Sequence, residues 1–394
     1  MEKPRRKLRI VFIDYVLEPD KPGITGLSDL VWDMATELVN IGHDVHIVAS
    51  YYTHVYPDNR VIVHNFKTPP IGYRNAIGQL LILYRASKIV KTLDADIVHA
   101  PEYVSTAVLG ALAYKKPMIV TPPGNIYQQI RHHGYNGEWY YYQILKWALK
   151  TSIKYCDVII ASSTELKRLW EETGSDPNKT IYIPLGVNAA RFSFVPLARK
   201  KLNLPAEKLI FLYVGRFSIE KGIGDLLEAF RLAGLSQYED RVQIIFIGKG
   251  QIASEIESKL QASGLNKIVT IIDWVDQNQL SLWYSAADAL FLPSWFEAFG
   301  RVLTEAFICG TPVIASQTGA ARDHIVDGKT GFSFPPQDKH ALAEILTTII
   351  THPQLLKEMR PAVMAYTQGN LNWTRIMERI LEEVYYPVIA HHER

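Results

Sequence analysis

Residues Pro293 to Ile314 read PSWFEAFGRVLTEAFICGTPVI, and the patterns in this stretch set the architecture that we expect for the whole chain. The apolar run before it, Ala289 to Leu292, stops at Pro293 as a buried parallel strand does. From Gly300 onward apolar residues recur at helical spacing, and Pro312 precedes a new apolar run. The sequence therefore predicts strand, loop, helix and strand.

Two acidic residues lie in this unit, Glu297 on the loop and Glu305 on the helix. On a helical wheel Glu305 lies well away from the apolar residues, so we expect it to flank the helix rather than enter the core. Ligands of open α/β sheets bind beyond the carboxyl ends of the strands, so the pair is a candidate ligand clamp. An acid near a helix N-terminus also suits the helix dipole, so Glu305 alone has a purely structural interpretation.

The composition is that of a soluble globular protein, because 48% of the residues are hydrophobic and 21% are charged. A length of 394 residues fits two domains of ordinary size. The net charge of +2 argues against a dedicated nucleic-acid binder. Cys156 and Cys309 have neither disulfide-framework nor metal-type spacing, which favours a reducing compartment.

The first residues resemble a signal peptide only briefly, since the apolar run Leu8 to Ile13 ends at Asp14. No stretch reaches the roughly eighteen apolar residues of a membrane span. We therefore expect a cytoplasmic protein that is neither exported nor integral to a membrane.

Apolar, strand-like runs alternate with helical patterns along most of the chain, which predicts doubly wound parallel sheets. The first series is Leu8–Ile13, Val45–Ala49, Val61–Phe66, Ile97–Ala100, Met118–Thr121, Val158–Ala161 and Ile181–Pro184. The second is Leu209–Val214, Val242–Ile247, Ile268–Ile272, Ala289–Leu292, Val313–Ala315 and Phe332–Phe334. We expect two α/β domains facing a cleft, residues 1–184 with 375–394 packed on them, and residues 185–374.

A cationic loop, GRFSIEKG at 215–222, follows the first strand of the second domain. Arg216 and Lys221 beside a helix N-terminus suit a diphosphate, and an exposed loop with solvated side chains is the alternative. Further polar loops follow at 248–250, 273–275 and 317–320 on the same predicted sheet edge. Together they suit an elongated, anionic, hydroxyl-rich ligand such as a nucleotide sugar.

The first domain lacks the G-x-G-x-x-G pattern of dinucleotide-binding dehydrogenases between its first strand and helix. Gly26 just before that helix allows an anion to approach the backbone, and it is also compatible with a simple turn.

With these motifs in order, the chain resembles the retaining GT-B glycosyltransferases of the paired-glutamate family, which includes glycosyl transferases group 1, sucrose synthases and bacterial mannosyltransferases. The resemblance covers nearly the whole chain and implies two Rossmann-like domains, with the C-terminal helix crossing back to the first. It implies a hexosyltransferase that uses a UDP- or GDP-sugar. The motifs are the Gly26 loop, Gly42 to Val45, Pro184 to Phe192, GRFSIEKG, DWVDQNQLSLWYSAADALFLPS at 273–294, the two glutamates and GAARDHIVDGKTGFSF at 319–334.

The resemblance also implies roles for particular residues. Glu297 matches the glutamate near the reacting sugar carbon, and Glu305 matches the one that holds the ribose. Arg216 and Lys221 match the pair that neutralises the diphosphate. The remaining donor-binding positions are Gly26, Gly215, Val275, Ala298, Phe299 and Gly300.

No cofactor or metal is expected, because cations and a helix N-terminus already stabilise the charge on a leaving diphosphate. The sequence contains no aspartate-rich or histidine cluster for a metal. Retention at the anomeric carbon is compatible with a carboxylate nucleophile. The family's usual proposal is a front-face route in which the leaving phosphate receives the acceptor's proton.

One position departs from the family pattern, since Pro123 stands where many members carry a histidine. The histidine's acceptor-side role is then either absent from this chain or supplied by His99, Asn125, His132 or His133, with His99 equally explained as a strand-end residue. The departure keeps open a non-catalytic nucleotide-sugar binding protein. A nucleotide-sugar epimerase of the same architecture is a further alternative, against which the spacing of the paired glutamates favours transfer.

Residues 139–154 mix aromatic and basic residues in a helical pattern, the composition of an interfacial helix. The family resemblance implies a lipid-linked acceptor alongside sugar and polyol acceptors, because many members act on lipid-linked substrates. With this helix it leads us to expect peripheral contact with the inner membrane face. A helix packed in the core with solvated lysines is the alternative.

Overall fold

The structure is a computed structural model that describes residues 6–14, 25–50, 58–67, 76–122 and 139–394. The chain forms two compact units, Met1–Pro184 with Trp373–Arg394, and Leu185–Asn372. Each unit is built on one parallel sheet, as the alternating strand and helix patterns predict.

The sheet of the first unit has seven strands in the order β3-β2-β1-β4-β5-β6-β7. Its strands are β1 (Arg9–Asp14), β2 (Asp44–Ser50), β3 (Ile62–Phe66), β4 (Ile97–Ala100), β5 (Met118–Val120), β6 (Val158–Ala161) and β7 (Thr180–Tyr182). Ile10 of β1 pairs with Val45 on one side and with Ile97 on the other. The strand order therefore reverses between β1 and β4.

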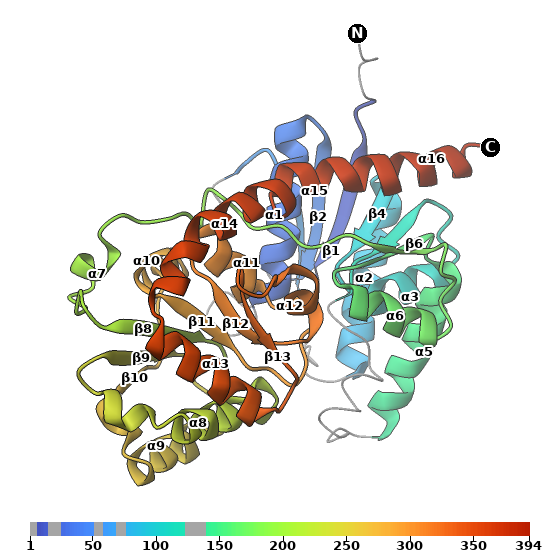
Figure 1. The fold of residues 1–394 in the computed structure, drawn as a ribbon. Coiled ribbons are helices and arrows are strands. Elements are labelled where there is room, and N and C mark those ends of the chain that lie inside the picture. The colour runs from blue at the N-terminus through green and yellow to red at the C-terminus, as the bar shows by residue number, and fades with distance from the viewer. Residues whose placement is uncertain (1–5, 15–24, 51–57, 68–75, 123–138) are drawn as a thin grey trace. The chain divides into compact units, whose positions relative to one another are not determined.

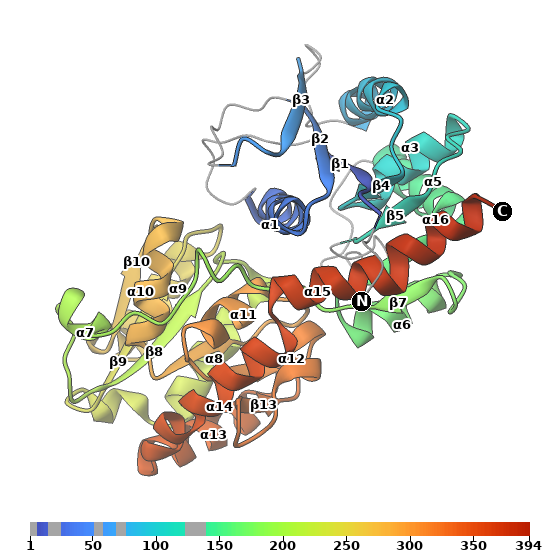
Figure 2. The ribbon, with the colours of Figure 1, turned by 90° about the horizontal axis from the view of Figure 1, so that it is seen from above.

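Helices cover both faces of this sheet, with α2, α3, α5 and α6 in one core cluster on one face and α1 in contact with α15 on the other (Figure 2). Their bounds are α1 (Thr25–Ile41), α2 (Ala76–Thr92), α3 (Tyr103–Ala111), α5 (Trp139–Tyr155), α6 (Thr164–Glu172) and α15 (Trp373–Ile380). The predicted interfacial helix is α5, which buries Leu145, Ala148 and Leu149 in the core and leaves Trp147 43% exposed. One face of α5 is thus packed in the core, as expected if the helix is not interfacial.

The sheet of the second unit has six strands in the order β10-β9-β8-β11-β12-β13. They are β8 (Leu209–Val214), β9 (Val242–Ile247), β10 (Val269–Ile272), β11 (Ala289–Leu292), β12 (Val313–Ser316) and β13 (Gly331–Phe334). Phe211, Phe230, Phe246 and Phe291 pack their rings together in the core. Here the strand order reverses between β8 and β11.

The helices of the second unit also lie on both faces, with α8, α9 and α13 together and α10, α11 and α14 together (Figure 1). Their bounds are α7 (Ala198–Lys201), α8 (Ile223–Leu232), α9 (Ala253–Ala262), α10 (Gln277–Ala286), α11 (Arg301–Ile308), α12 (Gly319–His324), α13 (Lys339–Thr351) and α14 (Gln354–Asn370), with short 3-10 turns η1 (Ile219–Lys221), η2 (Leu235–Tyr238) and η3 (Leu265–Lys267). This helix order follows from right-handed crossovers between parallel strands.

The last segment of the chain returns to the first unit at Trp373. There α15 packs against α1, followed by the π-helical turn η4 (Leu381–Tyr385) and α16 (Tyr386–His392). Within the described ranges, none of the helices combines the length and hydropathy that a bilayer-spanning segment needs.

Candidate donor-binding site

The strongest candidate site lies where the strand order of the second unit reverses, because ligands of doubly wound sheets bind at such points. The loops after β8 and β11 meet there, and the Trp295 amide donates to the Glu220 carbonyl over 2.9 Å. Gly222 has φ of +68° and lies so close that a Cβ would come within 2.0 Å of the Pro293 carbonyl oxygen. A side chain at Gly222 would push the two loops apart.

The central contact of this site is an ion pair between Lys221 and Glu297, predicted as separate binding residues. Glu297 Oε1 also accepts a hydrogen bond of 2.9 Å from the Ser294 hydroxyl. The two charged side chains are only 22% and 12% exposed, so water screens the pair weakly. The pair therefore places a cation and a carboxylate together at the carboxyl edge of the sheet.

Arg216 lies on the same loop but points to solvent, with 69% of its side chain exposed. Its Nη2 is 4.0 Å from Glu220 Oε1, which is a loose contact. The loop beneath it is held by the buried Tyr213 hydroxyl, which donates to the Arg216 carbonyl over 2.9 Å. Burial and the nearby Glu297 carboxylate raise the pKa of Tyr213 well above its usual value, so the phenol stays protonated.

Glu305 corrects one prediction, because it lies inside the unit rather than on the flank of α11. The residue is 6% exposed, and its Oε2 accepts a 2.8 Å hydrogen bond from Tyr284 on α10. Arg301 Nε is 3.9 Å from the other oxygen, Oε1. The helical wheel was misleading because α10 covers the side of α11 that the wheel left to solvent.

The backbone from Ala298 to Gly300 continues the loop after β11, and the first residue of α12 packs against the start of this segment. A Cβ at that residue, Gly319, would lie 2.2 Å from the Glu297 carbonyl oxygen. The Phe299 side chain is buried and packs edge-on to His324 at 6.3 Å between ring centroids. The Phe299 ring therefore packs inside the unit, and its carbonyl accepts a hydrogen bond of 3.3 Å from the Ala320 amide.

Two further loops reach the same edge of the sheet. The Gly215 amide donates to Ile247 of β9 over 3.0 Å, and the Gly248 amide donates to Ile272 of β10 over 2.9 Å. Val275 follows β10 and packs half-buried against the core of the second unit. The polar loops after β8, β9 and β10 are thus neighbours, as their order in the sheet requires.

On the first unit, Gly26 lies in the first turn of α1, which begins at Thr25 rather than after the glycine. Asn125, His132, His133 and Pro123 lie outside the described residues. The acceptor-side interpretation of these positions therefore stays a prediction.

His99 on β4 is fully engaged inside the first unit. Its Nδ1 lies 2.5 Å from the Tyr385 hydroxyl and its Nε2 lies 2.7 Å from the Thr121 hydroxyl. Burial lowers the pKa of His99 to about 3, so the ring is neutral. The geometry favours the structural interpretation of His99, which joins two strand ends to the C-terminal segment.

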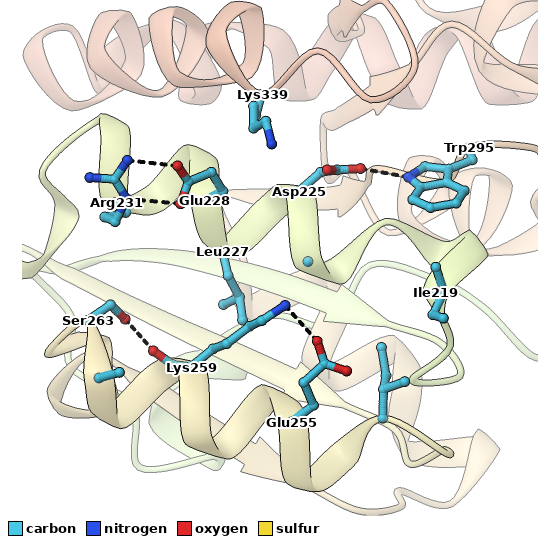
Figure 3. Close-up of a pocket in the computed structure, with 13 residues that line it drawn as sticks. Ile219, Asp225, Leu227, Glu228, Arg231, Glu255, Lys259, Ser263, Trp295 and Lys339 are labelled. Atoms are coloured by element: carbon cyan, nitrogen blue, oxygen red, sulfur yellow. Dashed lines mark hydrogen bonds and ion pairs between the residues drawn. The ribbon is translucent and has the colours of Figure 1, made fainter.

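A pocket of about 630 Å³ lies on the second unit, between α8 and α9 (Figure 3). Four of its charged groups form two ion pairs, Arg231 with Glu228 and Lys259 with Glu255. Trp295 at its end donates its indole N–H to Asp225 over 2.6 Å. Ile219 and Trp295, from the loops after β8 and β11, also line it, so the pocket adjoins the candidate site.

The sequence analysis missed Tyr284 and Ser294, which donate hydrogen bonds to Glu305 and Glu297. It also missed the Trp295–Asp225 bond, which joins the loop after β11 to α8. Only the short spacing of Ser294 from Glu297 offered a signal in the sequence. Across the described ranges, no group of three His, Cys, Asp or Glu residues is arranged to hold a metal ion.

Two doubly wound units, one with a cationic and acidic loop cluster at its switch point, define the GT-B class of fold. The solved sucrose-phosphate synthase from Thermosynechococcus elongatus matches 98% of this chain and 100% of its own, with a TM-score of 0.82 and 24% identity. Anabaena Alr3699/HepE in complex with UDP-glucose matches 96% of this chain and 100% of its own, with a TM-score of 0.75 and 20% identity.

The family follows from the sequence matches. Residues 195–364 match the model for glycosyl transferases group 1, and residues 24–191 match the model for Glycosyltransferase Family 4. The chain belongs to the group 1 glycosyltransferases, as its motifs predict.

Curated relatives differ in how much of their length is matched. The glycogen synthase of Mycobacterium tuberculosis (strain CDC 1551 / Oshkosh) is 26% identical over 94% of this chain and 92% of its own. The D-inositol 3-phosphate glycosyltransferase of Arthrobacter sp. (strain FB24) is 29% identical over 58% of this chain. The match spans only 55% of that relative, about half its length.

Proposed function

We propose that this protein transfers a hexose from a nucleoside diphosphate sugar to a sugar, lipid-linked or small polyol acceptor, with retention at the anomeric carbon. The observation that carries the proposal is the Lys221–Glu297 pair at the switch point of the second unit. A donor of this kind needs a cation beside its diphosphate and a polar group beside its sugar. A similarly folded protein has been solved with UDP-glucose, which supports a UDP-sugar as the first donor to test.

Charge at the leaving diphosphate is the main demand of the reaction. The exposed Arg216 guanidinium and the Lys221 ammonium supply positive charge on one loop. The N-terminus of α8, which begins at Ile223 directly after that loop, adds its dipole. These groups would stabilise the departing diphosphate without reorganising water.

We assign to Glu297 the role of the family's sugar-contacting glutamate, and its contacts with Lys221 and Ser294 support this assignment. When a donor binds, Lys221 would share its charge between this carboxylate and the phosphate. Glu297 would then be available to the reacting sugar, either as a nucleophile or as a stabiliser of positive charge in a front-face route. The diphosphate's oxygens would take the acceptor's proton in the second case.

The test is a nucleotide-release assay with UDP-glucose, GDP-mannose and ADP-glucose against sugar, polyol and lipid-linked acceptors. We expect one donor to release its nucleoside diphosphate faster when an acceptor is present, with a product whose anomeric proton coupling matches the donor's. Conversion of the sugar without any acceptor would indicate an epimerase instead. Tight binding with no turnover for any pair would indicate a binding protein.

We also propose that a lipid-linked acceptor is met at an anionic membrane surface. Trp147 on α5 is 43% exposed, and Lys150 on the same helix is exposed as well. Flotation with anionic vesicles at low salt should carry the protein upward, and the double variant Trp147→Ala, Lys150→Glu should not float. If the wild type stays at the bottom, the membrane part of the proposal is wrong.

A further inference from the structure

We propose that Tyr284 is a positioning residue, which orients Glu305 to receive the ribose hydroxyls of a nucleotide donor. The inference rests on the proposed function, and it assigns a task to a residue that does not itself touch the ligand. Its basis is the 2.8 Å hydrogen bond from the Tyr284 hydroxyl to Glu305 Oε2.

The direction of this hydrogen bond is settled by its surroundings. Tyr284 is 0% exposed, and burial together with the Glu305 carboxylate raises its pKa well above the usual value. The phenol therefore stays protonated and donates a hydrogen bond to Oε2, because a second negative charge beside the carboxylate would be unfavourable. A hydrogen bond to a charged acceptor is among the stronger ones in proteins.

Tyr284 is itself held in place, which makes it suited to positioning. Its ring packs against Phe192 with 6.3 Å between centroids. Its backbone carbonyl accepts a hydrogen bond of 2.5 Å from the Thr311 hydroxyl, which follows the end of α11. The tyrosine therefore joins α10 to the far end of the helix that carries Glu305, and its hydroxyl has a defined position.

The hydrogen bond to Oε2 fixes the plane of the Glu305 carboxylate, and this fixes the direction in which Oε1 accepts hydrogen bonds. Arg301 Nε lies 3.9 Å from Oε1, on the N-terminal turn of α11. A carboxylate accepts about four hydrogen bonds, so ligand hydroxyls can add to these contacts. Without the tyrosine hydroxyl, the carboxylate would turn toward Arg301 and lose its orientation for a ribose.

The test compares ribonucleotides with 2′,3′-dideoxynucleotides by titration calorimetry. UDP, GDP and ADP are first titrated into the wild type, and the tightest binder is compared with its dideoxy form. We expect the wild type to prefer the ribonucleotide by about tenfold or more, which is what a hydrogen bond to a charged group contributes. In Tyr284→Phe this preference should fall to about twofold, with little change in affinity for the dideoxy form.

A purely structural role would weaken both nucleotides equally, so the ratio separates the two explanations. Tyr366→Phe is the matched control, since it removes a phenol hydroxyl that bonds to His324 at 2.8 Å, and it should keep the wild-type ratio. Combining Tyr284→Phe with Glu305→Gln should have little effect on the ratio beyond that of Glu305→Gln alone, because both act through one contact.

The outcomes distinguish this inference from the proposed function. If the wild type prefers the ribonucleotide and Tyr284→Phe keeps that preference, Tyr284 does not position Glu305. Nucleotide binding with no ribose preference would overturn the inference and leave donor binding intact. If none of the three nucleotides binds, the proposed function fails and the inference fails with it.

Discussion

Lys221 and Glu297 form an ion pair across two loops although 76 positions separate them in the chain. One residue closes the 3-10 turn η1 after β8, and the other lies on the loop after β11. Because β8 and β11 are adjacent strands, their carboxyl ends bring the two side chains together. The positive charge expected to meet a diphosphate is therefore already balanced by a carboxylate.

The first prediction concerns this ion pair. Lys221→Ala and Glu297→Ala should each lower kcat/KM for the best donor by about 10²–10³, the range found for losing one preorganised electrostatic contact. Steady-state kinetics with nucleotide release as the readout checks this. Lys259→Ala is the control, because that lysine pairs with Glu255 on α9 and should leave turnover unchanged. Wild-type rates in both site variants would refute the assignment.

A second prediction compares two glycines with nearly the same backbone. Gly222 and Gly264 have φ of +68° and +70°, but only Gly222 faces a backbone atom, the Pro293 carbonyl oxygen. Gly264→Ala should cost about 1–2 kcal/mol, the penalty for a left-handed residue with a Cβ. Gly222→Ala should cost about 1–3 kcal/mol more through the clash and should weaken nucleotide binding. Urea unfolding measures the stabilities, and equal costs would contradict the proximity of the two loops.

A third prediction uses the buried histidine of the first unit. Burial lowers the pKa of His99 to about 3, so the unfolded chain binds a proton at mildly acidic pH that the folded unit does not. This contribution to stability is complete above the unfolded pKa of about 6.5 and declines as the pH falls toward 3. Between pH 7.5 and 5.5 we expect His99 to account for a loss of about 1.4 kcal/mol.

His99→Gln is the corresponding variant. It should be less stable than the wild type at pH 7.5, because the hydrogen bonds to Tyr385 and Thr121 are altered, but its stability should depend less on pH. Urea unfolding at both pH values gives the comparison. An equally steep pH dependence in the variant would show that another group is responsible.

The fourth prediction concerns metals. Arg216, Lys221 and the N-terminus of α8 are proposed to neutralise the diphosphate, so EDTA should not lower the rate of nucleotide release. The same assay should show no stimulation by added Mg²⁺ or Mn²⁺. A rate that falls severalfold with EDTA and returns with one of these ions would mean that a cation shares this task.

The sequence predicted the order and the approximate bounds of the strands, because parallel strands buried on both faces leave short apolar runs that end at polar loops. Six such runs predicted the second sheet, and its strands differ from them by at most one residue at either end. The motifs from the Gly26 loop to residues 319–334, taken together and in order, predicted the family, which the family matches confirm. These features depend on local pattern, which the sequence contains directly.

Contacts between distant segments were decided only by the tertiary structure. A helical wheel assigned Glu305 to the flank of α11, but α10 covers that side and Tyr284 bonds to the carboxylate. His99 was an acceptor candidate until packing placed Tyr385, 286 positions away, against its ring. Periodicity describes one helix or strand at a time, whereas burial and the partners of a charge depend on which elements the fold brings alongside it.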